Sequence, residues 1–364
     1  MLKILEVSMK IFEGKIVLVT GGTGSMGKTF VRRVLSGELG LPKKIIVLSR
    51  DEAKQHDMRM SYLNKKSSTD EVIYRNFMNV LEFRIGDVRN YSDVCSAIKD
   101  ANIVISAAAL KQVPSCEYFP EQAILTNCIG PNNIVRAIRE NGYPVETVIG
   151  ISTDKACKPV NVMGMTKAIQ ERIYISANIL NPGTRFICVR YGNVLASRGS
   201  VIPLFHDQIM NGGPVTITVP EMTRFMLTLD QACDTVFAAI AGAKRGEIYI
   251  PNAPSATVIS IAKALIGQRK IEIKITGIRP GEKVHEILAS EEEINHCVKR
   301  GEYYAILPML PELMDNAAQA PNHFMKEYSS ADNEINLEGT IRLLRKYKLM
   351  LEDLDLTKKE ELLR

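Results

Sequence analysis

The segment Lys15-Ile-Val-Leu-Val-Thr-Gly-Gly-Thr-Gly-Ser-Met-Gly27 runs from an apolar, β-branched stretch into a glycine-rich turn, and a helical pattern follows over residues 28–35. Glycines at such a turn let backbone N–H groups approach a pyrophosphate closely, and the positive end of the helix points at it. The strand, the helix and the three-residue spacing of the glycines together predict a dinucleotide-binding unit. The residues predicted to surround the cofactor here are Gly21, Thr23, Gly24, Ser25, Met26 and Gly27.

Short apolar runs alternate with longer amphipathic segments over the first half of the chain. Such alternation predicts right-handed βαβ crossovers and a doubly wound parallel sheet with helices on both faces, the Rossmann-like α/β class. The predicted strands cover residues 15–20, 44–48, 81–85, 103–106, 147–151 and 184–190. The polar stretch 64–70 interrupts the alternation and predicts a surface loop.

Glycine and proline become frequent after Asn193, with short helices and strands between them. This change predicts a smaller α/β lobe that closes over a cleft and binds the substrate. We therefore expect a cofactor-binding domain over residues 14–193, a substrate-binding lobe over 194–332 and a helical tail over 333–364. Within the tail, the amphipathic segment 337–351 predicts a helix docked on the surface.

Basic and acidic residues are interspersed along the chain, so the net charge of +5 leaves no concentrated basic footprint for nucleic acid. No apolar run approaches the roughly 20 residues that a membrane-spanning helix needs, and the start of the chain is too mixed for a secretion signal. The seven cysteines and five histidines show neither disulfide nor metal-ligand spacing. We expect a cytoplasmic protein with reduced thiols, no metal and an anionic small molecule as its ligand.

The end of the second predicted strand indicates which dinucleotide is bound. An acidic residue at this position would bond the two ribose hydroxyls of NAD. Ser49, Arg50 and Lys54 instead supply a hydroxyl and two cations, which suit the 2′-phosphate of NADP. NADP is therefore favoured over NAD. In the other interpretation Asp51 is the ribose acid, although Asp51 is also a suitable N-cap for the helix that follows.

The ends of the third and fourth predicted strands carry further cofactor candidates. Asp87 and Val88 follow the third strand, where the adenine would lie. Ala107, Ala108 and Ala109 follow the fourth strand, and their small side chains would let the nicotinamide ribose approach. Because ligands bind outside the carboxyl ends of parallel strands, these positions fit a bound dinucleotide.

Polar and charged side chains follow the fifth predicted strand in the sequence Ser152-Thr-Asp-Lys155, again at a carboxyl end. Met163 and Lys167 come next, four residues apart and therefore on one face of a predicted helix. Lys167 is placed to hold the nicotinamide ribose and to lower nearby pKa values. Met163 cannot exchange a proton.

These blocks resemble the extended short-chain dehydrogenases that act on nucleotide sugars, and most of all the bacterial UDP-N-acetylglucosamine 4,6-dehydratases of polysaccharide and glycan biosynthesis. The likeness runs from about residue 14 to residue 291 and rests on six blocks in order: 20–27, 49–54, 107–114, 152–167, 190–203 and 277–286. Where these dehydrogenases usually carry Tyr-x-x-x-Lys, this chain has methionine and lysine. That pair resembles the soluble, capsule-type branch whose product is inverted at C5.

The resemblance implies a reaction in which NADP oxidises C4 of the sugar, water is lost across C5 and C6, and the hydride returns to C6. It implies that Asp154 is the acid at the C6 hydroxyl, Lys155 the base at C5 and Thr153 a hydrogen-bonding partner near the C4 oxygen. Lys155 could act as a base if neighbouring lysines or burial lowered its pKa, and Asp154 could stay protonated if it were buried. The group that takes the C4 hydroxyl proton is left open between Lys155 and a water.

The same resemblance assigns the second lobe to UDP-N-acetylglucosamine and implies that Arg224 and Arg279 lie near its diphosphate. Other implied contacts to substrate or cofactor are Glu282, Asn193, Ser200, Val201, Lys111 and Asn127. His285 is expected to pack rather than to react. Relatives assemble as dimers to hexamers, so a homo-oligomer is expected.

Two functions other than a hydro-lyase stay open. A nucleotide-sugar C4 epimerase would use the same fold, although methionine in place of tyrosine argues against it. A protein that binds NADP without turning over a sugar would also keep the fold. The presence of Thr153, Asp154, Lys155 and Lys167 within one motif argues against that second alternative.

Overall fold

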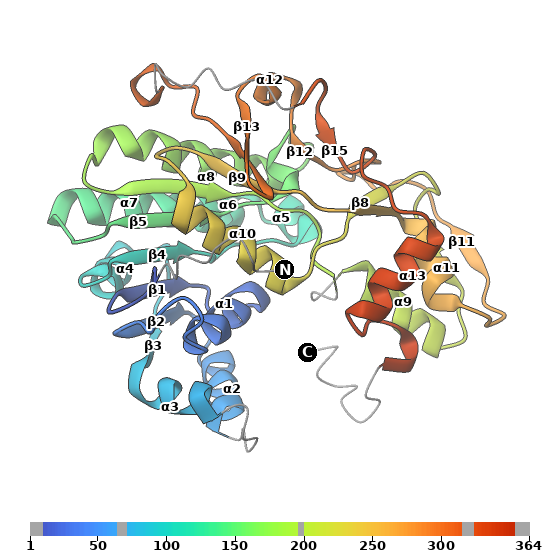
Figure 1. Ribbon diagram of the computed structural model, residues 1–364, viewed down its shortest axis with the longest axis horizontal. Coiled ribbons are helices and arrows are strands. Elements are labelled where there is room, and N and C mark those ends of the chain that lie inside the picture. The colour runs from blue at the N-terminus through green and yellow to red at the C-terminus, as the bar shows by residue number, and fades with distance from the viewer. Residues whose placement is uncertain (1–9, 64–70, 196–199, 315–323, 354–364) are drawn as a thin grey trace.

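The computed structural model describes residues 10–63, 71–195, 200–314 and 324–353. The nine strands of its central sheet are β1 (Ile16–Thr20), β2 (Lys44–Ser49), β3 (Leu81–Ile85), β4 (Ile103–Ser106), β5 (Thr147–Ile151), β6 (Arg185–Val189), β9 (Ile248–Pro251), β13 (Cys297–Arg300) and β14 (Tyr303–Ile306). Their order is β13-β14-β9-β6-β5-β4-β1-β2-β3, with parallel pairing from β3 to β9 (Figure 1). The six predicted strands are all present, each within one residue of its predicted ends.

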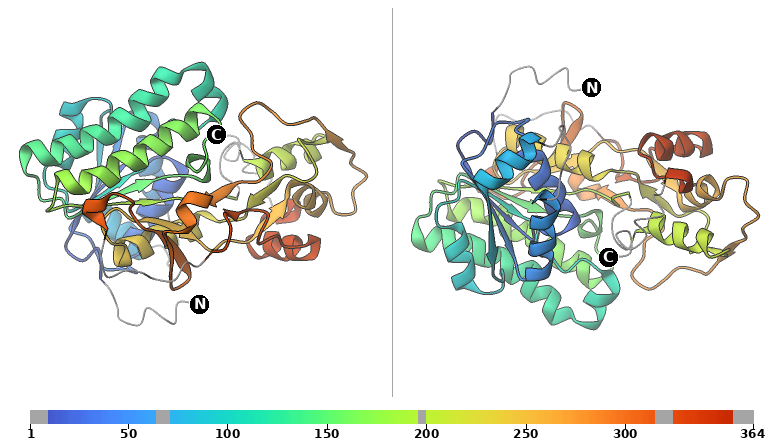
Figure 2. Two further views of the ribbon diagram at one scale, coloured as in Figure 1. Left: turned by 90° about the horizontal axis from the view of Figure 1, so that it is seen from above. Right: turned by 90° about the horizontal axis from the view of Figure 1, so that it is seen from below.

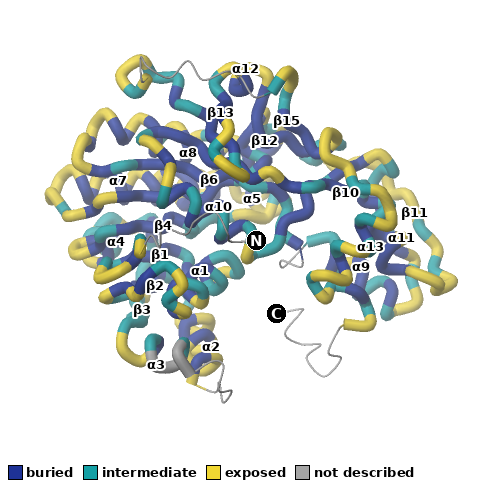
Figure 3. Tube along the Cα trace, in the orientation of Figure 1, coloured by how far each residue is buried: buried dark blue, intermediate teal, exposed yellow. Residues whose placement is uncertain are grey.

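Helices cover both faces of this sheet, which confirms the doubly wound α/β prediction. The helices are α1 (Ser25–Leu35), α2 (Glu52–Leu63), α3 (Glu71–Val80), α4 (Tyr91–Ile98), α5 (Val113–Tyr118), α6 (Pro120–Ile124), α7 (Gly130–Asn141), α8 (Val162–Leu180), α9 (Val201–Met210), α10 (Leu229–Gly242), α11 (Val258–Ile266), α12 (Glu291–Ile294) and α13 (Leu337–Lys346). Leu18 of β1 packs with α4, α7 and α8, while Val17 and Val19 pack with α1, α3 and α10. Each central strand is therefore apolar on both sides, as a parallel sheet requires. Figure 3 shows the resulting buried layer through the strands.

The predicted boundary at residues 193 and 194 does not separate two independent stretches of chain. Strands β9, β13 and β14, together with α10, come from beyond residue 194 and complete the first lobe. Strands β14 and β13 add antiparallel at the edge of the sheet. The chain thus crosses between the lobes several times, and the two lobes share one framework.

The second lobe is built on short paired strands and three helices (Figure 2). Its strands β7 (Val215–Ile217) and β11 (Ile273–Ile275) pair parallel, and β8 (Thr223–Phe225) and β10 (Ser255–Thr257) pair antiparallel. Helices α9, α11 and α13 enclose a separate apolar core around Phe205 and Leu265. Leu344 of α13 is completely buried in that core, which confirms the predicted docked helix over a shorter range. The predicted loop at 64–70 and the tail beyond residue 353 lie outside the described residues.

A buried cation joins the first lobe to the segment that returns from the second. Arg190, directly after β6, is 1% exposed. Its guanidinium binds Glu171 of α8 at 2.7 Å and Glu293 of α12 at 2.8 Å. It also donates to the carbonyl of Leu288, in β12 (Ile287–Ala289), at 2.7 Å. One side chain therefore fixes three segments that are far apart in the sequence.

Removal of this cation should destabilise the whole fold. Arg190→Met would leave two carboxylates buried without a counter-ion, which costs about 3–5 kcal/mol. Arg136→Met is the matched control, because Arg136 forms an exposed pair with Glu140 that contributes only about 0.5 kcal/mol. Urea unfolding measures both free energies. A loss for Arg190→Met no larger than for the control would contradict the role of Arg190.

Candidate active site

A cavity of about 930 Å³ lies at the carboxyl ends of the parallel strands and extends beneath the second lobe. It is the place where ligands bind in open α/β sheets. Of the residues predicted from the sequence to bind cofactor or substrate, or to react, all but Asn127 line this cavity. The structure thus brings together residues that lie as far apart in the sequence as Gly21 and Glu282.

The glycine-rich turn has the shape that a bound pyrophosphate needs. Gly21 has a φ of +67°, and a Cβ at this position would lie 2.7 Å from the Cα of Ala108. A Cβ on Gly27 would collide with the backbone of Gly22. Helix α1 begins just after Gly24 and carries no acidic residue in its first turn. The turn can therefore present backbone N–H groups and a positive helix end to an anion.

The end of β2 presents cations and a hydroxyl to the same cavity. The hydroxyls of Ser49 and Thr23 lie 3.0 Å apart. Arg50 lies 3.5 Å from the Asp87 carboxylate, and both side chains line the cavity. These groups fit an adenosine ribose that carries a phosphate.

Asp51 has a structural role at the start of α2. Its carboxylate accepts a hydrogen bond from the Lys54 backbone N–H at 3.0 Å, as an N-cap does. The Lys54 ammonium, 2.6 Å away, lowers the pKa of Asp51. The carboxylate is thus already engaged, which favours the N-cap interpretation over that of a ribose acid.

Asn127 does not line the cavity, contrary to the sequence prediction. Its side chain is completely buried and exchanges two hydrogen bonds with the backbone of Leu110, at 2.8 and 2.9 Å. A further bond of 3.0 Å joins it to Thr166 of α8. Asn127 therefore holds the loop that carries Lys111, and both N–H donors of its side-chain amide are already used.

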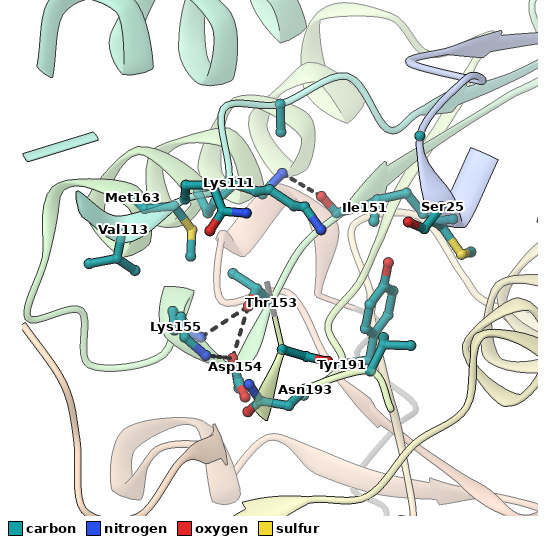
Figure 4. A pocket seen from close by; sticks show the side chains of 18 of the residues that line it. Ser25, Lys111, Val113, Ile151, Thr153, Asp154, Lys155, Met163, Tyr191 and Asn193 are labelled. Atoms are coloured by element: carbon teal, nitrogen blue, oxygen red, sulfur yellow. Dashed lines mark hydrogen bonds and ion pairs between the residues drawn. The ribbon is translucent and has the colours of Figure 1, made fainter. Parts of the chain in front are cut away.

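The turn after β5 gathers titratable groups at the cavity wall (Figure 4). Asp154 is completely buried, and its backbone N–H donates to the carbonyl of Tyr191 at 3.1 Å. The Thr153 hydroxyl donates to Asp154 Oδ1 at 2.9 Å. The Lys155 ammonium lies 3.0 Å from that same oxygen and 3.1 Å from Oε1 of Glu286. One ammonium is thus shared by two buried carboxylates.

This arrangement shifts the pKa values of Asp154 and Lys155, the two groups predicted to act as acid and base. Burial, and then the charge of Glu286, raise the pKa of Asp154, as expected for an acid. Burial alone would lower the pKa of Lys155, but the Asp154 and Glu286 carboxylates raise it above the usual value for lysine. The condition set for Lys155 as a base, a pKa lowered by its surroundings, is therefore not met in this structure. Asp154 contributes most to the upward shift, and Glu286, which the sequence analysis did not single out, adds to it.

Met163 and Lys167 lie on one face of α8, as predicted, and both line the cavity. The Lys167 ammonium donates to the carbonyl of Ile151 and to Gln170, each at 2.5 Å. Burial lowers the pKa of Lys167 to about 8. Met163 packs against Cys116 and Ala123, so a thioether occupies the position where a tyrosine hydroxyl would face the ligand.

The second lobe contributes polar groups with unused hydrogen-bonding capacity. Arg224 and Arg279 line the cavity together with Val201. Among the described residues, five buried side-chain oxygens that face the cavity have no hydrogen-bond partner: Asp154 Oδ2, Asn193 Oδ1, Ser200 Oγ, Glu282 Oε2 and Glu286 Oε2. Buried polar atoms are normally paired. Their concentration here indicates a polar ligand.

Two further charged residues, Glu286 and Lys283, line the cavity and were missed by the sequence analysis. Both belong to the block 277–286 that carried the family resemblance, but neither follows a predicted strand end. His285, next to them, pairs with the Thr223 hydroxyl at 2.9 Å and does not line the cavity. That placement agrees with the packing role expected for it.

The close packing of α8 against the turn after β5 predicts an unusual response to a small substitution. A Cβ on Gly164, at the start of α8, would overlap the carbonyl oxygen of Lys155. Alanine in a helix normally stabilises by about 1 kcal/mol relative to glycine, but this clash should reverse the sign and destabilise by about 1–3 kcal/mol. Thermal unfolding of Gly164→Ala measures the change. Gly183→Ala is the control, since a Cβ on Gly183 meets nothing within 4 Å, and equal effects of the two substitutions would contradict the predicted clash.

Comparison with known proteins agrees with this fold and site. The model of a family described as polysaccharide biosynthesis protein matches residues 17–308. Curated relatives include proteins named UDP-glucose 4-epimerase from Rickettsia bellii (strain OSU 85-389), at 40% identity, and Rickettsia conorii, at 41%. Each alignment spans 355 residues, 94% of this chain and 99% of the relative.

Solved structures give the same result. The X-ray structure of Pen from Bacillus thuringiensis superposes with a TM-score of 0.82 at 33% identity, covering 93% of this chain and 99% of that one. The dTDP-glucose 4,6-dehydratase DesIV from Streptomyces venezuelae, with NAD and TYD bound, has a TM-score of 0.63 at 19% identity, covers 92% and 98% of the two chains, and shares the fold.

The chain thus has the fold seen in nucleotide-sugar dehydratases and epimerases of known structure. The chain belongs to the polysaccharide biosynthesis protein family. Over the described part of the chain, no helix is long and apolar enough to cross a membrane. The same residues contain no group of three or more side chains suited to hold a metal ion.

Proposed function

We propose that the protein is an NADP-dependent UDP-N-acetylglucosamine 4,6-dehydratase that inverts C5, a hydro-lyase. The buried cluster of Asp154, Lys155 and Glu286 carries this proposal. Loss of water across C5 and C6 needs a base at C5 and an acid at the C6 hydroxyl, in addition to the redox step at C4. A C4 epimerase needs only the redox step. Two buried carboxylates beside a half-buried lysine at the cavity wall exceed what epimerisation requires.

NADP, when bound, supplies the redox chemistry: it accepts the hydride of C4 and later returns it to C6. Lys167 and the turn at Thr153 lie beside the expected position of the nicotinamide and the C4 oxygen. The ketone at C4 acidifies the C5 hydrogen, which leaves as a proton to the Lys155 amine. Asp154 gives its proton to the departing C6 hydroxyl, and water is released.

Inversion follows if C5 regains a proton on the opposite face as C6 receives the hydride. The proton lost from the C4 hydroxyl balances the one that leaves with water. Asp154 suits its part because its Oδ2 atom has no partner among the described residues and faces the cavity. Lys155 must first lose its own proton, and the ionised carboxylate within hydrogen-bonding distance to receive it is Glu286, 3.1 Å from Nζ.

The second candidate is a nucleotide-sugar C4 epimerase. The names of the Rickettsia relatives, at about two-fifths identity over nearly the whole chain, favour it. Both candidates begin with oxidation at C4. They differ in what happens next, since only the dehydratase releases water.

Incubation of the purified protein with NADP and UDP-N-acetylglucosamine distinguishes the two candidates. We expect a product lighter than the substrate by one water, detected by mass spectrometry, with its C5 configuration assigned by NMR. A product of unchanged mass with inverted C4 would establish the epimerase instead. Unchanged substrate would contradict both.

Lys155→Ala should remove the base at C5. In D₂O we expect deuterium incorporation at C5 to fall by about 10²–10⁴-fold, with NADP affinity unchanged. Lys158→Ala is the control, because Lys158 follows the same turn but pairs with Glu327 and Glu291 away from the cavity. Undiminished exchange in Lys155→Ala would exclude Lys155 as the base.

NADP preference should depend on Arg50. Arg50→Ala should weaken NADP binding by roughly 10- to 100-fold, since it removes a charge-assisted bond to the 2′-phosphate, and should leave NAD binding nearly unchanged. Titration of cofactor fluorescence measures both affinities. Arg59→Ala is the control, because Arg59 lies on α2, which follows Arg50, and stacks on Phe83 outside the cavity. Equal losses for both dinucleotides in Arg50→Ala would contradict a 2′-phosphate site.

A further inference from the structure

Glu286 is the least expected member of the acid–base cluster. It enters the site from a segment more than 130 positions beyond Asp154 in the sequence, and its side chain is 3% exposed. Its Oε1 atom lies 3.1 Å from Lys155 Nζ and 3.7 Å from Arg224 Nε. Its Oε2 atom is buried, faces the cavity and has no partner among the described residues.

The backbone around Glu286 holds this carboxylate in place. Its N–H donates a hydrogen bond to the Ser330 hydroxyl oxygen at 2.9 Å, and its carbonyl accepts one from the Ser330 N–H at 2.8 Å. Strand β12 begins at the next residue and is tied to Arg190 through the carbonyl of Leu288. Glu286 is therefore anchored on both sides, so its contact with Lys155 follows from the fold itself.

The charges around the cluster are unevenly distributed. Lys155 faces both carboxylates, but Arg224 lies on the Glu286 side, and Lys283 also acts on Glu286. Asp154 is buried more deeply and has Lys155 as its close cation, at 3.0 Å. Two buried carboxylates cannot both be neutralised by one ammonium. The carboxylate with more cations around it should keep its charge, and the other should keep its proton.

The pKa directions agree with this division. Burial raises the pKa of Glu286, but Lys155 and Arg224 lower it more, so that the net shift is downward. The pKa of Asp154 is raised by burial and by Glu286, and Lys155 does not reverse that shift.

We propose that Glu286 is a positioning residue that takes Lys155 as its ion-pair partner and thereby leaves Asp154 in its neutral, acidic form. This inference rests on the proposed dehydratase function and deepens it. Asp154 keeps its own proton for the C6 hydroxyl. Without Glu286, Asp154 would be the ion-pair partner of Lys155 and would lose the proton that the leaving group needs.

Infrared spectroscopy of the ligand-free protein tests the resting state without any assumption about the substrate. At neutral pH ordinary carboxyl groups are ionised, so the carbonyl stretch of a protonated carboxyl is distinctive. We expect this band in the wild type, and we expect Asp154→Asn and Glu286→Gln both to abolish it. Glu291→Gln is the matched control, because Glu291 is an exposed carboxylate five positions further on, and it should keep the band.

Two infrared outcomes would overturn the proposal. A band that persists in Glu286→Gln would show that Asp154 holds its proton without Glu286. A band that persists in Asp154→Asn but disappears in Glu286→Gln would show that Glu286 is the protonated group. Either result stands whatever the protein does to UDP-N-acetylglucosamine, so failure of this proposal is distinguishable from failure of the proposed function.

Single-turnover kinetics separate positioning from structural damage. In Glu286→Gln, reduced cofactor should still form as C4 is oxidised, while C5 exchange and water loss fall by about 100-fold or more. Glu286→Asp, which keeps a carboxylate, should recover part of that loss. Equal slowing of cofactor reduction and water loss, with no recovery in Glu286→Asp, would overturn the proposal and assign Glu286 a purely structural role.

Discussion

The buried Arg190 guanidinium is the interaction on which the site depends. It binds Glu171 and Glu293 and donates to the carbonyl of Leu288, so it joins β6, α8 and the returning segment. Glu171 also accepts a hydrogen bond from the hydroxyl of Ser152, at the start of the reactive turn. Glu286 lies two residues before Leu288. One cation therefore sets the positions of both halves of the acid–base cluster, which explains how an exact distance can be kept between groups so far apart in the sequence.

The parallel part of the fold could be predicted because its signals are local. Strands β1, β2, β4, β5 and β6 are short, mainly apolar runs buried on both faces, whereas β3 lies at the edge of the sheet and is only half-buried. The glycine turn could also be predicted, since Gly21 needs a positive φ and close approach to Ala108. Strands β9, β13 and β14 were not predicted, because their place in the sheet depends on pairing between segments that are far apart in the sequence. The predicted domain boundary was too simple for the same reason.

For the site, too, the sequence predicted which residues line the cavity but not the surroundings that set their charge. Thr153, Asp154 and Lys155 directly follow a parallel strand, and the carboxyl ends of such strands meet at one edge of the sheet. Their position in the sequence therefore predicted that they line the cavity. It did not reveal their charge states, which depend on Glu286 and Arg224 from distant segments. The family resemblance assigned Asn127 to substrate or cofactor, whereas in the structure its side-chain amide bonds Leu110 and Thr166. Sequence position therefore predicts which residues approach a ligand better than it predicts what they can do there.

The Rickettsia relatives are named as epimerases, whereas the site of this chain suggests a dehydratase, and the two reactions would share their first step. Oxidation at C4 needs a nicotinamide and a nearby group for one proton, and it is common to epimerases and dehydratases. The two reactions differ at C5 and C6, because epimerisation at C4 does not need a buried acid there. In this chain Met163 removes the usual hydroxyl at the first step, while Asp154, Lys155 and Glu286 place three titratable groups where the second would occur. Burial of two carboxylates beside one ammonium is costly for stability, and the dehydratase reaction that we propose would use the proton that such an arrangement retains.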